Sequence, residues 1–534
     1  MSDERNQLDV VIVGAGFAGL YMLHKARQLG LSARVIEAGG GVGGTWYWNR
    51  YPGARCDIES LEYSYGFDED LQQEWEWSER YAPQPEILSY ADHVADRYDL
   101  RRDIQLDTKV VSAAYDDGTG RWTTATDRGD QLSSQFLVMA TGCLSAANVP
   151  EIAGAESFTG ASYHTGQWPH EGVDFAGLRV GVIGTGSSAI QSIPIIAEQA
   201  AELTVFQRTP TYSVPAWNRS LTPEEVAEVK GRYQEFRRDN ELQMAAYGSR
   251  VPAPERGALE VSEEERRAEY EARWRQGGLA FLGGFTDLLI DPVANETAAE
   301  FIRERIRATV TDPEVAERLI PDQVVGCKRL CVDTGYYDTY NRPNVTLVDL
   351  RKSPIEEITP AGIRTSEEEH ELDVIVYATG FDAMTGALLR VDIRGRDGQA
   401  LKDAWEAGPR TYLGLGVHGF PNLFTITGPG SPSVLTNMMV SIQQHVEWIA
   451  DCMEHLRSTG RGRIEALPEA QDEWVDYVNM VGSFTLFPTC NSWYLGANVP
   501  GKTRVFMPLL GFPLYKEKCD QVAEAGYEGF ALTS

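Results

Sequence analysis

The chain has 534 residues, enough for roughly two to four domains, and its hydrophobic content of 43% is ordinary for a globular protein. Its formal net charge of −30 disfavours binding to nucleic acids and anionic membranes, because both need clustered lysine and arginine. The chain contains no apolar run of about 18 residues, and its polar first residues are unlike a signal peptide. We therefore expect a cytoplasmic protein; its oligomeric state is left open.

Seven cysteines occur, at positions 56, 143, 327, 331, 452, 490 and 519. Their number is odd, and no C-x-x-C pair is present. The closest spacing, between Cys327 and Cys331, lacks the second pair that a zinc site needs. We predict reduced thiols and no metal site.

A glycine fingerprint near the N-terminus predicts a dinucleotide site. Residues 14–19 read G-A-G-F-A-G between an apolar run at 10–13 and a helix predicted to continue to about Leu29. The next strand, at 35–36, ends in an acid 18 residues after the last glycine, where a ribose hydroxyl is usually bound. The alternative is a glycine-rich turn. The predicted contacts are Gly14, Gly16, Phe17, Ala18, Gly19 and Glu37.

Residues 39–53 are rich in glycine and aromatic residues, which indicates backbone wrapped around a ligand rather than a surface loop. Gly44, Thr45 and Trp46 are the candidate contacts there. Asp57 follows, and two interpretations remain open for it. It is either a helix cap or surface acid, or a charge partner inside the cofactor cleft.

A second fingerprint, G-T-G-S-S-A at 184–189, follows the apolar run at 180–183. The next predicted strand, at 203–206, leads to Arg208 and Thr209 instead of an acid. Because arginine binds a 2′-phosphate that an acid would repel, this site is predicted to take NADP(H); a surface arginine is the alternative. The predicted fingerprint contacts are Gly184, Thr185, Gly186, Ser187 and Ser188.

Two apolar strands, predicted at 136–140 and 374–378, both end in A-T-G, which suggests two related nucleotide domains with crossings between them. The predicted fold class is α/β, with two Rossmann-like domains. The first comprises residues 1–145 and 384–534, and the second 146–220 and 321–383. Helix-start signals at 222–225 and 262–265 predict a helical insertion over 221–320.

Two further motifs are candidates for the active site. Lys328 and Arg329 either balance surface acids or bind a nucleotide phosphate and an oxyanion. The turn G-P-G-S-P at 428–432 is predicted to open a helix at about Val434, whose N-terminus favours developing negative charge.

The stretch 158–169, F-T-G-A-S-Y-H-T-G-Q-W-P, lies between the two nucleotide units as a predicted linker. Together with both fingerprints, G-G-T-W-Y-W-N-R-Y-P-G, F-Q-R-T-P, K-R and A-T-G-F-D in this order, it resembles the type I Baeyer–Villiger monooxygenases. The chain is most similar to the steroid and phenylacetone enzymes, and residues 262–274 and 496–508 favour the former.

The resemblance implies an FAD enzyme that uses NADPH and O₂. A C4a-peroxyflavin anion would attack a ketone and give an ester or lactone plus water, and a bulky, aryl, cyclic or steroid-like ketone is expected. The implied catalytic residues are Arg329, Asp57 and His164. Further cofactor contacts are Asp57, Tyr63, Gln191, Arg208, Thr209, Lys328 and Trp493, and candidate substrate contacts are Tyr63, Leu435 and Met438.

Three alternatives differ in chemistry. A flavin monooxygenase acting on sulfur or nitrogen shares both fingerprints but lacks the W-P ending at 168–169. A flavin disulfide reductase needs a cysteine pair close in sequence, which is absent. A non-catalytic flavin sensor would bind FAD without consuming NADPH.

Overall fold

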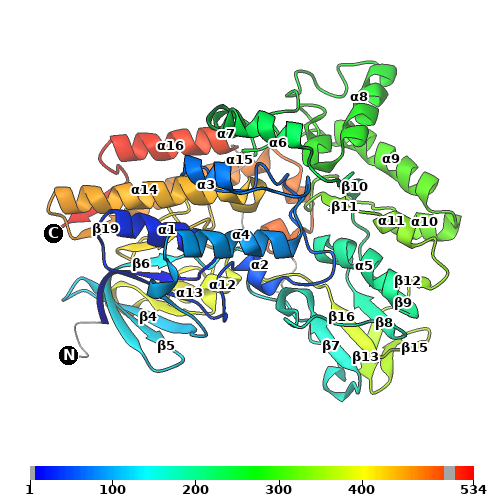
Figure 1. Cartoon of the computed structure of the whole chain (residues 1–534), viewed down its shortest axis with the longest axis horizontal. Coiled ribbons are helices and arrows are strands. Elements are labelled where there is room, and N and C mark those ends of the chain that lie inside the picture. Colours follow the sequence, from blue (N-terminus) through cyan, green and yellow to red (C-terminus); the bar gives the residue numbers. More distant parts are fainter. Residues whose placement is uncertain (1–5, 498–510) are drawn as a thin grey trace.

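The computed structural model describes residues 6–497 and 511–534, so most of the stretch 496–508 lies outside the described residues. Two sheets built mainly from parallel strands dominate the molecule (Figure 1). The first lies toward the two termini, and the second lies at the other end, below the helical segment around α8 and α9. The expected fold class, two Rossmann-like units with a helical insertion, is confirmed.

The first sheet forms around β1, in which Val10, Val11 and Ile12 are fully buried, as is typical of a parallel strand covered on both faces. Helix α1 packs against α14, and the Tyr21 hydroxyl donates to Glu447 over 2.9 Å. The strands in spatial order are β17 (Asp392–Arg394), β4 (Val110–Asp116), β5 (Arg121–Thr126), β6 (Gln131–Met139), β1 (Gln7–Val13), β2 (Ala33–Ile36) and β3 (Ile104–Gln105), with β18 (Leu423–Thr425) paired to β6. The helices beside them are α1 (Phe17–Gln28), α2 (Thr45–Trp48), α3 (Glu69–Glu74), α4 (Gln84–Arg97), α12 (Gly386–Leu389), α13 (Leu401–Ala404), α14 (Met438–Ser458), α15 (Pro468–Ser483) and α16 (Phe512–Glu524).

The second sheet is parallel throughout its described strands and contains the second fingerprint between β8 and α5 (Ser187–Gln199). Its order is β12 (Val345–Asp349), β9 (Glu202–Gln207), β8 (Arg179–Ile183), β16 (Val374–Tyr377) and β7 (Ala161–His164). Strand β7 belongs to the stretch predicted to be a linker, so that stretch is partly an edge strand of the sheet. A small antiparallel sheet of β13 (Ile355–Thr359), β14 (Gly362–Thr365) and β15 (Glu369–Glu371) follows β12.

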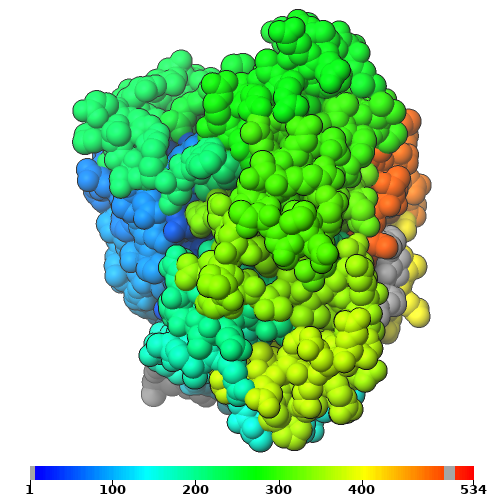
Figure 2. Space-filling model, turned by 90° about the vertical axis from the view of Figure 1, so that its right-hand side faces the viewer, coloured from blue at the N-terminus to red at the C-terminus, as the bar shows by residue number. Residues whose placement is uncertain are grey.

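Between β10 (Ser213–Pro215) and β11 (Cys331–Asp333) the chain forms a series of helices joined by loops. Strand β11 then pairs with β10. Its helices are α6 (Pro223–Lys230), α7 (Tyr233–Glu241), α8 (Glu263–Gln276), α9 (Pro292–Thr309) and α10 (Pro313–Leu319). Both predicted helix starts are confirmed, because Thr222 and Ser262 each form a reciprocal capping box with a glutamate three residues later. Figure 2 shows these helices, in green, packed above the yellow and cyan surface of the second sheet.

The remaining elements are α11 (Tyr336–Thr339) and the antiparallel pair β19 (Arg463–Ala466) and β20 (Phe530–Thr533). Among the described residues, no helix has the combined length and hydropathy of a membrane span.

Candidate active site

One large cavity of about 2030 Å³ runs along the carboxyl ends of the central strands of both sheets. Turns after β1 and β8 contribute the two fingerprints, and the loop before β11 contributes Lys328 and Arg329. Nearly all predicted site residues line this cavity; the exceptions are Gly19, His164 and Leu435. The structure therefore brings together residues that lie more than 400 positions apart, from Gly14 to Trp493.

The turn after β1 is built for close backbone packing. A Cβ on Gly19 would lie 1.8 Å from the Gly14 carbonyl oxygen, so Gly19 allows the helix to approach the strand without itself facing the cavity. Glu37 is buried, and its carboxylate accepts the N–H groups of Ala15 and Gly39, both over 2.7 Å. Burial raises the pKa of Glu37 despite these hydrogen bonds. Glu37 thus holds the fingerprint loop while lining the cavity.

The segment after β2 adds a second wall of backbone and aromatic rings. Gly44 has a φ of 55°, and a Cβ there would lie 2.8 Å from the Gly16 Cα. The indole of Trp46 donates to the Tyr63 hydroxyl over 3.2 Å, and the rings of Phe17 and Tyr63 meet edge to face. These contacts hold a narrow, backbone-lined pocket of the shape that a dinucleotide such as FAD requires.

Arg329 contributes a firmly paired cation to the lining of the cavity. Its Nε and Nη2 donate to the two carboxylate oxygens of Asp57 over 2.7 and 2.9 Å, and Nη1 donates to the Val434 carbonyl over 2.6 Å. Burial opposes the charged form, but attraction to Asp57 prevails and holds the pKa of Arg329 well above its ordinary value. Asp57 is therefore a charge partner, which decides between the two interpretations of this residue.

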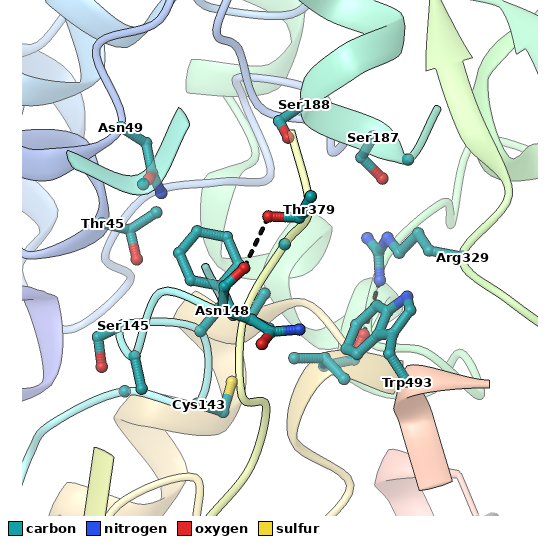
Figure 3. Close-up of a pocket in the computed structure, with 18 of the residues that line it drawn as sticks. Thr45, Asn49, Cys143, Ser145, Asn148, Ser187, Ser188, Arg329, Thr379 and Trp493 are labelled. Atoms are coloured by element: carbon teal, nitrogen blue, oxygen red, sulfur yellow. Dashed lines mark hydrogen bonds between the residues drawn. The ribbon is translucent and has the colours of Figure 1, made fainter. Parts of the chain in front are cut away.

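Two tyrosines near Arg329 were missed by sequence reasoning. Tyr494, which is buried, and Tyr247, which is half-buried, both lie within the electrostatic reach of Arg329. Burial raises the pKa of Tyr494 to about 12, although the neighbouring guanidinium lowers it. The sequence points to Tyr494 only because it follows the predicted contact Trp493. No local sequence pattern points to Tyr247. Figure 3 shows the Trp493 ring beside Arg329.

A second cationic group lies at the other fingerprint. Burial and the neighbouring charge of Arg208 both lower the pKa of Lys328, so the two cations lie close together. The Thr185 hydroxyl donates to the Thr209 carbonyl over 2.8 Å and ties the fingerprint to the turn after β9. Adjacent cations beside a helix N-terminus form a site suited to a phosphate.

His164 is the last residue of β7, and it lies beside the two chain segments, after β6 and after β16, that cross between the two units. The Gly166 N–H donates to its Nδ1 over 3.0 Å, so the proton of the neutral ring is on Nε2, which lies 3.3 Å from the Thr379 hydroxyl. That hydroxyl donates to the Asn148 carbonyl over 2.6 Å (Figure 3). Burial lowers the pKa of His164 and keeps the ring neutral. The ring thus contacts both crossings rather than the cavity.

The helix predicted to open at about Val434 begins later. The chain forms a 3-10 turn at η7 (Ser433–Leu435), and α14 starts at Met438 with the Asn437 side chain as its cap. The prediction was wrong because the backbone is extended at Thr436 (ψ 173°) and Asn437 (ψ 111°), so no α-helix can run through these residues. Consequently Met438 lines the cavity from the first turn of α14, and Leu435 is half-buried behind it.

The prediction that all cysteines are reduced was also wrong. Cys327 and Cys490 form a disulfide across 163 residues, with their Cα atoms 6.0 Å apart. Sequence spacing recognises only local pairs such as Cys327 and Cys331, and only the fold brings position 490 close. The other five cysteines carry free, buried thiols.

Comparisons with known proteins agree with this geometry. Residues 11–264 match the family described as pyridine nucleotide-disulphide oxidoreductase. Over 531 residues the chain is 45% identical to the acetone monooxygenase (methyl acetate-forming) of Gordonia sp. (strain TY-5), covering 98% of this chain and 99% of that protein. It is 44% identical to a Baeyer-Villiger monooxygenase of Pseudooceanicola batsensis, covering 97% and 95%. The solved structure of an oxidised steroid monooxygenase bound to NADP matches with a TM-score of 0.94 at 55% identity, covering 99% of each chain.

Similar structures have also been solved with FAD and NADP bound together. The two glycine cradles and the Lys328–Arg208 pair fit such cofactors, and the enzyme uses FAD and NADPH. The similarity over the whole chain and the cavity that joins both fingerprints to Arg329 lead to one assignment. The chain belongs to the Baeyer–Villiger monooxygenases, NADPH- and FAD-dependent enzymes that insert one oxygen atom of O₂ into a ketone.

Proposed function

We propose that the substrate is a bulky, aryl, cyclic or steroid-like ketone, which the enzyme converts to an ester or lactone. The observation that carries the proposal is the position of Arg329, a half-buried cation that lines a large cavity and is held by both carboxylate oxygens of Asp57. FAD, when bound, supplies the two-electron reduction that activates O₂. The protein has to bind the ketone, exclude water and stabilise negative charge on oxygen.

Arg329 is proposed as the group that stabilises this charge. Its guanidinium is held by Asp57 and by a backbone carbonyl, so it need not reorient when negative charge develops. Asp57 is proposed as the residue that orients Arg329 and keeps it charged. We assign His164 a supporting role. Its neutral ring lies against the Thr379 hydroxyl, which donates to the Asn148 carbonyl, so the ring helps to hold together the two chain segments that cross between the units.

NADPH is proposed to lie along the second fingerprint. Gly184, Thr185 and Gly186 form the turn, and Ser187, Ser188 and Gln191 belong to the first turns of α5 at the cavity wall. Arg208, Thr209 and Lys328 are proposed to hold the 2′-phosphate, since the two cations are adjacent. Trp493 is proposed to contact the nicotinamide, and the residues of the first fingerprint with Glu37, Gly44, Thr45, Trp46, Asp57 and Tyr63 to hold FAD.

The ketone is proposed to lie beside Arg329, where apolar side chains converge. Val434, Met438 and Ile442 line the cavity on one side, and Phe381 lines it as well. Tyr63 contributes directly to the lining, whereas Leu435 acts by supporting Met438. An apolar wall next to one fixed cation suits a hydrophobic ketone with a single polar oxygen.

The division into domains 1–145 with 384–534, 146–220 with 321–383, and the insertion 221–320 also stays a proposal. It is supported by strand membership, since β17 and β18 join the first sheet and β12 and β16 join the second. We further propose a cytoplasmic enzyme that binds neither nucleic acid nor membranes, in keeping with its charge of −30.

The decisive experiment compares the wild type with Arg329→Ala and Arg329→Lys on a panel of aryl, cyclic and steroid ketones. NADPH consumption, ester or lactone formation and released hydrogen peroxide are measured together. We expect Arg329→Ala to lose on the order of 10²- to 10³-fold in ester formation, with NADPH oxidation diverted to peroxide. Arg329→Lys keeps the charge but loses the bidentate pair, so an intermediate loss is expected.

A thioether and an amine serve as control substrates. Oxygenation of these with no product from any ketone would favour the heteroatom monooxygenase instead. Retention of ester formation by Arg329→Ala within about twofold of the wild type would contradict the role of Arg329.

A further inference from the structure

The Cys327–Cys490 pair is the one disulfide among the described residues, and it lies in the wall of the cofactor cavity. Both residues are buried, at 3% and 7% exposure, and both line the cavity. Their Cα separation of 6.0 Å lies within the usual range for disulfides. Neither residue is needed by the oxygenation chemistry argued above.

The pair joins the two segments that position the cations and the aromatic groups of the site. Cys327 directly precedes Lys328 and Arg329, while Cys490 lies three residues before Trp493. The same segments also approach each other at Arg329 and Tyr494, whose side chains lie within electrostatic reach. With the disulfide closed, the loop before β11 and the segment 490–495 are fixed to each other by a covalent bond.

We propose that Cys327 and Cys490 are a redox-active modification site, closed by hydrogen peroxide and opened by a small thiol, whose closure strengthens NADP(H) binding. One cysteine thiolate attacks a peroxide oxygen, the O–O bond breaks, and the cysteine becomes a sulfenic acid. The departing hydroxide takes up the proton that the thiol had lost and leaves as water. The second thiol attacks that sulfur, the S–O bond breaks, and a second water leaves. Reopening consumes two small-molecule thiols and yields their disulfide.

The oxidant arises in the same cavity whenever activated oxygen is released without reaching a ketone, and to this extent the inference rests on the proposed function. The fold already holds Cys327 and Cys490 with their Cα atoms 6.0 Å apart, so a sulfenic acid formed on one of them lies next to the thiol of the other. The other thiols in the cavity differ. Cys56, Cys143 and Cys331 are free cysteines, and burial raises the pKa of each of the three thiols, that of Cys331 to about 12.

The first test counts thiols in the full-length flavoprotein after reduction and desalting without air. Samples receive nothing, hydrogen peroxide, or NADPH and O₂ without ketone, the last with and without catalase, and are then denatured. We expect seven thiols without oxidant and five after peroxide or turnover, with the cross-link mapped to peptides of Cys327 and Cys490. Loss of thiols with catalase present means that peroxide reacts before it escapes; protection means that it reacts from solution.

Matched variants make the outcome specific. Cys143→Ser removes a cavity thiol that has no disulfide partner, and it should still lose two thiols on oxidation. Cys327→Ser and Cys490→Ser should form no cross-link, and each should lose at most the one remaining thiol of the pair, as a sulfenic acid. The inference is overturned if the wild type keeps all its thiols after both oxidising treatments, or if the lost thiols map elsewhere. It is equally overturned if the disulfide resists the small thiol in the folded enzyme.

The second test measures the dissociation constant of NADP⁺ by calorimetry for the closed and open forms. We expect about tenfold tighter binding by the closed form, because its loop is already held in place. Cys327→Ser should bind like the open form under both conditions. Equal affinities of the two wild-type forms would overturn the coupling. No ketone is needed in either test, so failure here is distinguishable from failure of the proposed substrate assignment.

Discussion

Single residues decide which nucleotide the second fingerprint accepts. Arg208 is exposed at the cavity edge, and its charge acts on the half-buried Lys328. We expect Arg208→Ala to raise KM for NADPH by about tenfold to a hundredfold, because a charge-assisted hydrogen bond of roughly 1.5–3 kcal/mol is lost. KM for NADH, which lacks the phosphate, should stay within about twofold. Steady-state kinetics with both nucleotides measures this.

Arg128→Ala, in the exposed turn between β5 and β6, is the matched control and should change neither constant. Equal effects of Arg208→Ala on the two nucleotides would refute the phosphate assignment.

We expect the free energy of unfolding to depend on pH through Glu62. Its carboxylate accepts the Gly248 N–H over 2.9 Å, and burial first and Glu59 second raise its pKa to about 7, against the opposing charges of Arg250 and Arg237. The folded protein therefore holds this proton more tightly than the unfolded chain. The resulting contribution to stability is present at low pH and is lost as pH rises from about 4.5 to about 7.

Glu62→Gln keeps an acceptor for Gly248 but removes the titration. Relative to the wild type, its free energy of unfolding should rise across that interval by on the order of 1–3 kcal/mol. Thermal melts at closely spaced pH values measure this as a diverging Tm. Glu224→Gln, at an exposed site, should run parallel to the wild type. If the Tm of Glu62→Gln also follows the Tm of the wild type in parallel across this pH range, Glu62 is not the cause of the pH dependence of stability.

At the scale of elements, the insertion helices depend on their caps. The Ser262 hydroxyl accepts the Glu265 N–H over 3.2 Å, and the Glu265 carboxylate accepts the Ser262 N–H over 3.0 Å. The first turn of α8 is solvent-exposed, and within the helix only Tyr270 and Arg273 are buried, so few tertiary contacts replace a lost cap. We expect Ser262→Ala to cost about 1 kcal/mol and to accelerate amide exchange in the first turns of α8.

Hydrogen–deuterium exchange with peptide resolution is the measurement. Ser262→Thr retains the cap and should restore protection, whereas exchange unchanged by Ser262→Ala would show that packing alone holds this helix.

At the scale of the whole molecule, the loop around Gly53 joins the two sheets. The Tyr51 hydroxyl donates to the Gln191 side-chain oxygen over 2.8 Å, and the Gln191 amide donates to the Arg55 carbonyl over 3.1 Å. Gly53 has a φ of 81°, and a Cβ there would lie 2.3 Å from the Gln191 backbone oxygen. Gly53→Ala should therefore push α5 away from the first sheet.

We expect Gly53→Ala to retain FAD but to raise KM for NADPH by about tenfold, since displaced contacts across a junction typically change binding by 1–3 kcal/mol. Flavin content and steady-state kinetics measure this. Gly129→Ala is the matched control, because its φ is 86° and its added Cβ would meet nothing within 4 Å. If the two variants have the same KM, contact with Gln191 does not position the NADP site.

The sequence by itself determined the local features of this protein. The strands and turns of both fingerprints and the caps at Thr222 and Ser262 were predicted, because hydrophobic period, glycine and capping residues act within a few positions of each other. The Arg329–Asp57 pair was anticipated only through family resemblance, since 272 positions separate the two residues.

Only the tertiary structure decided which distant groups meet. It placed Tyr247 and Tyr494 next to Arg329, closed Cys327 onto Cys490, and delayed the start of α14 to Met438. These outcomes depend on how loops from both sheets and from the insertion pack around one cavity. A local pattern cannot predict them, because the free energy that selects them comes from burial and pairing between segments far apart in the chain.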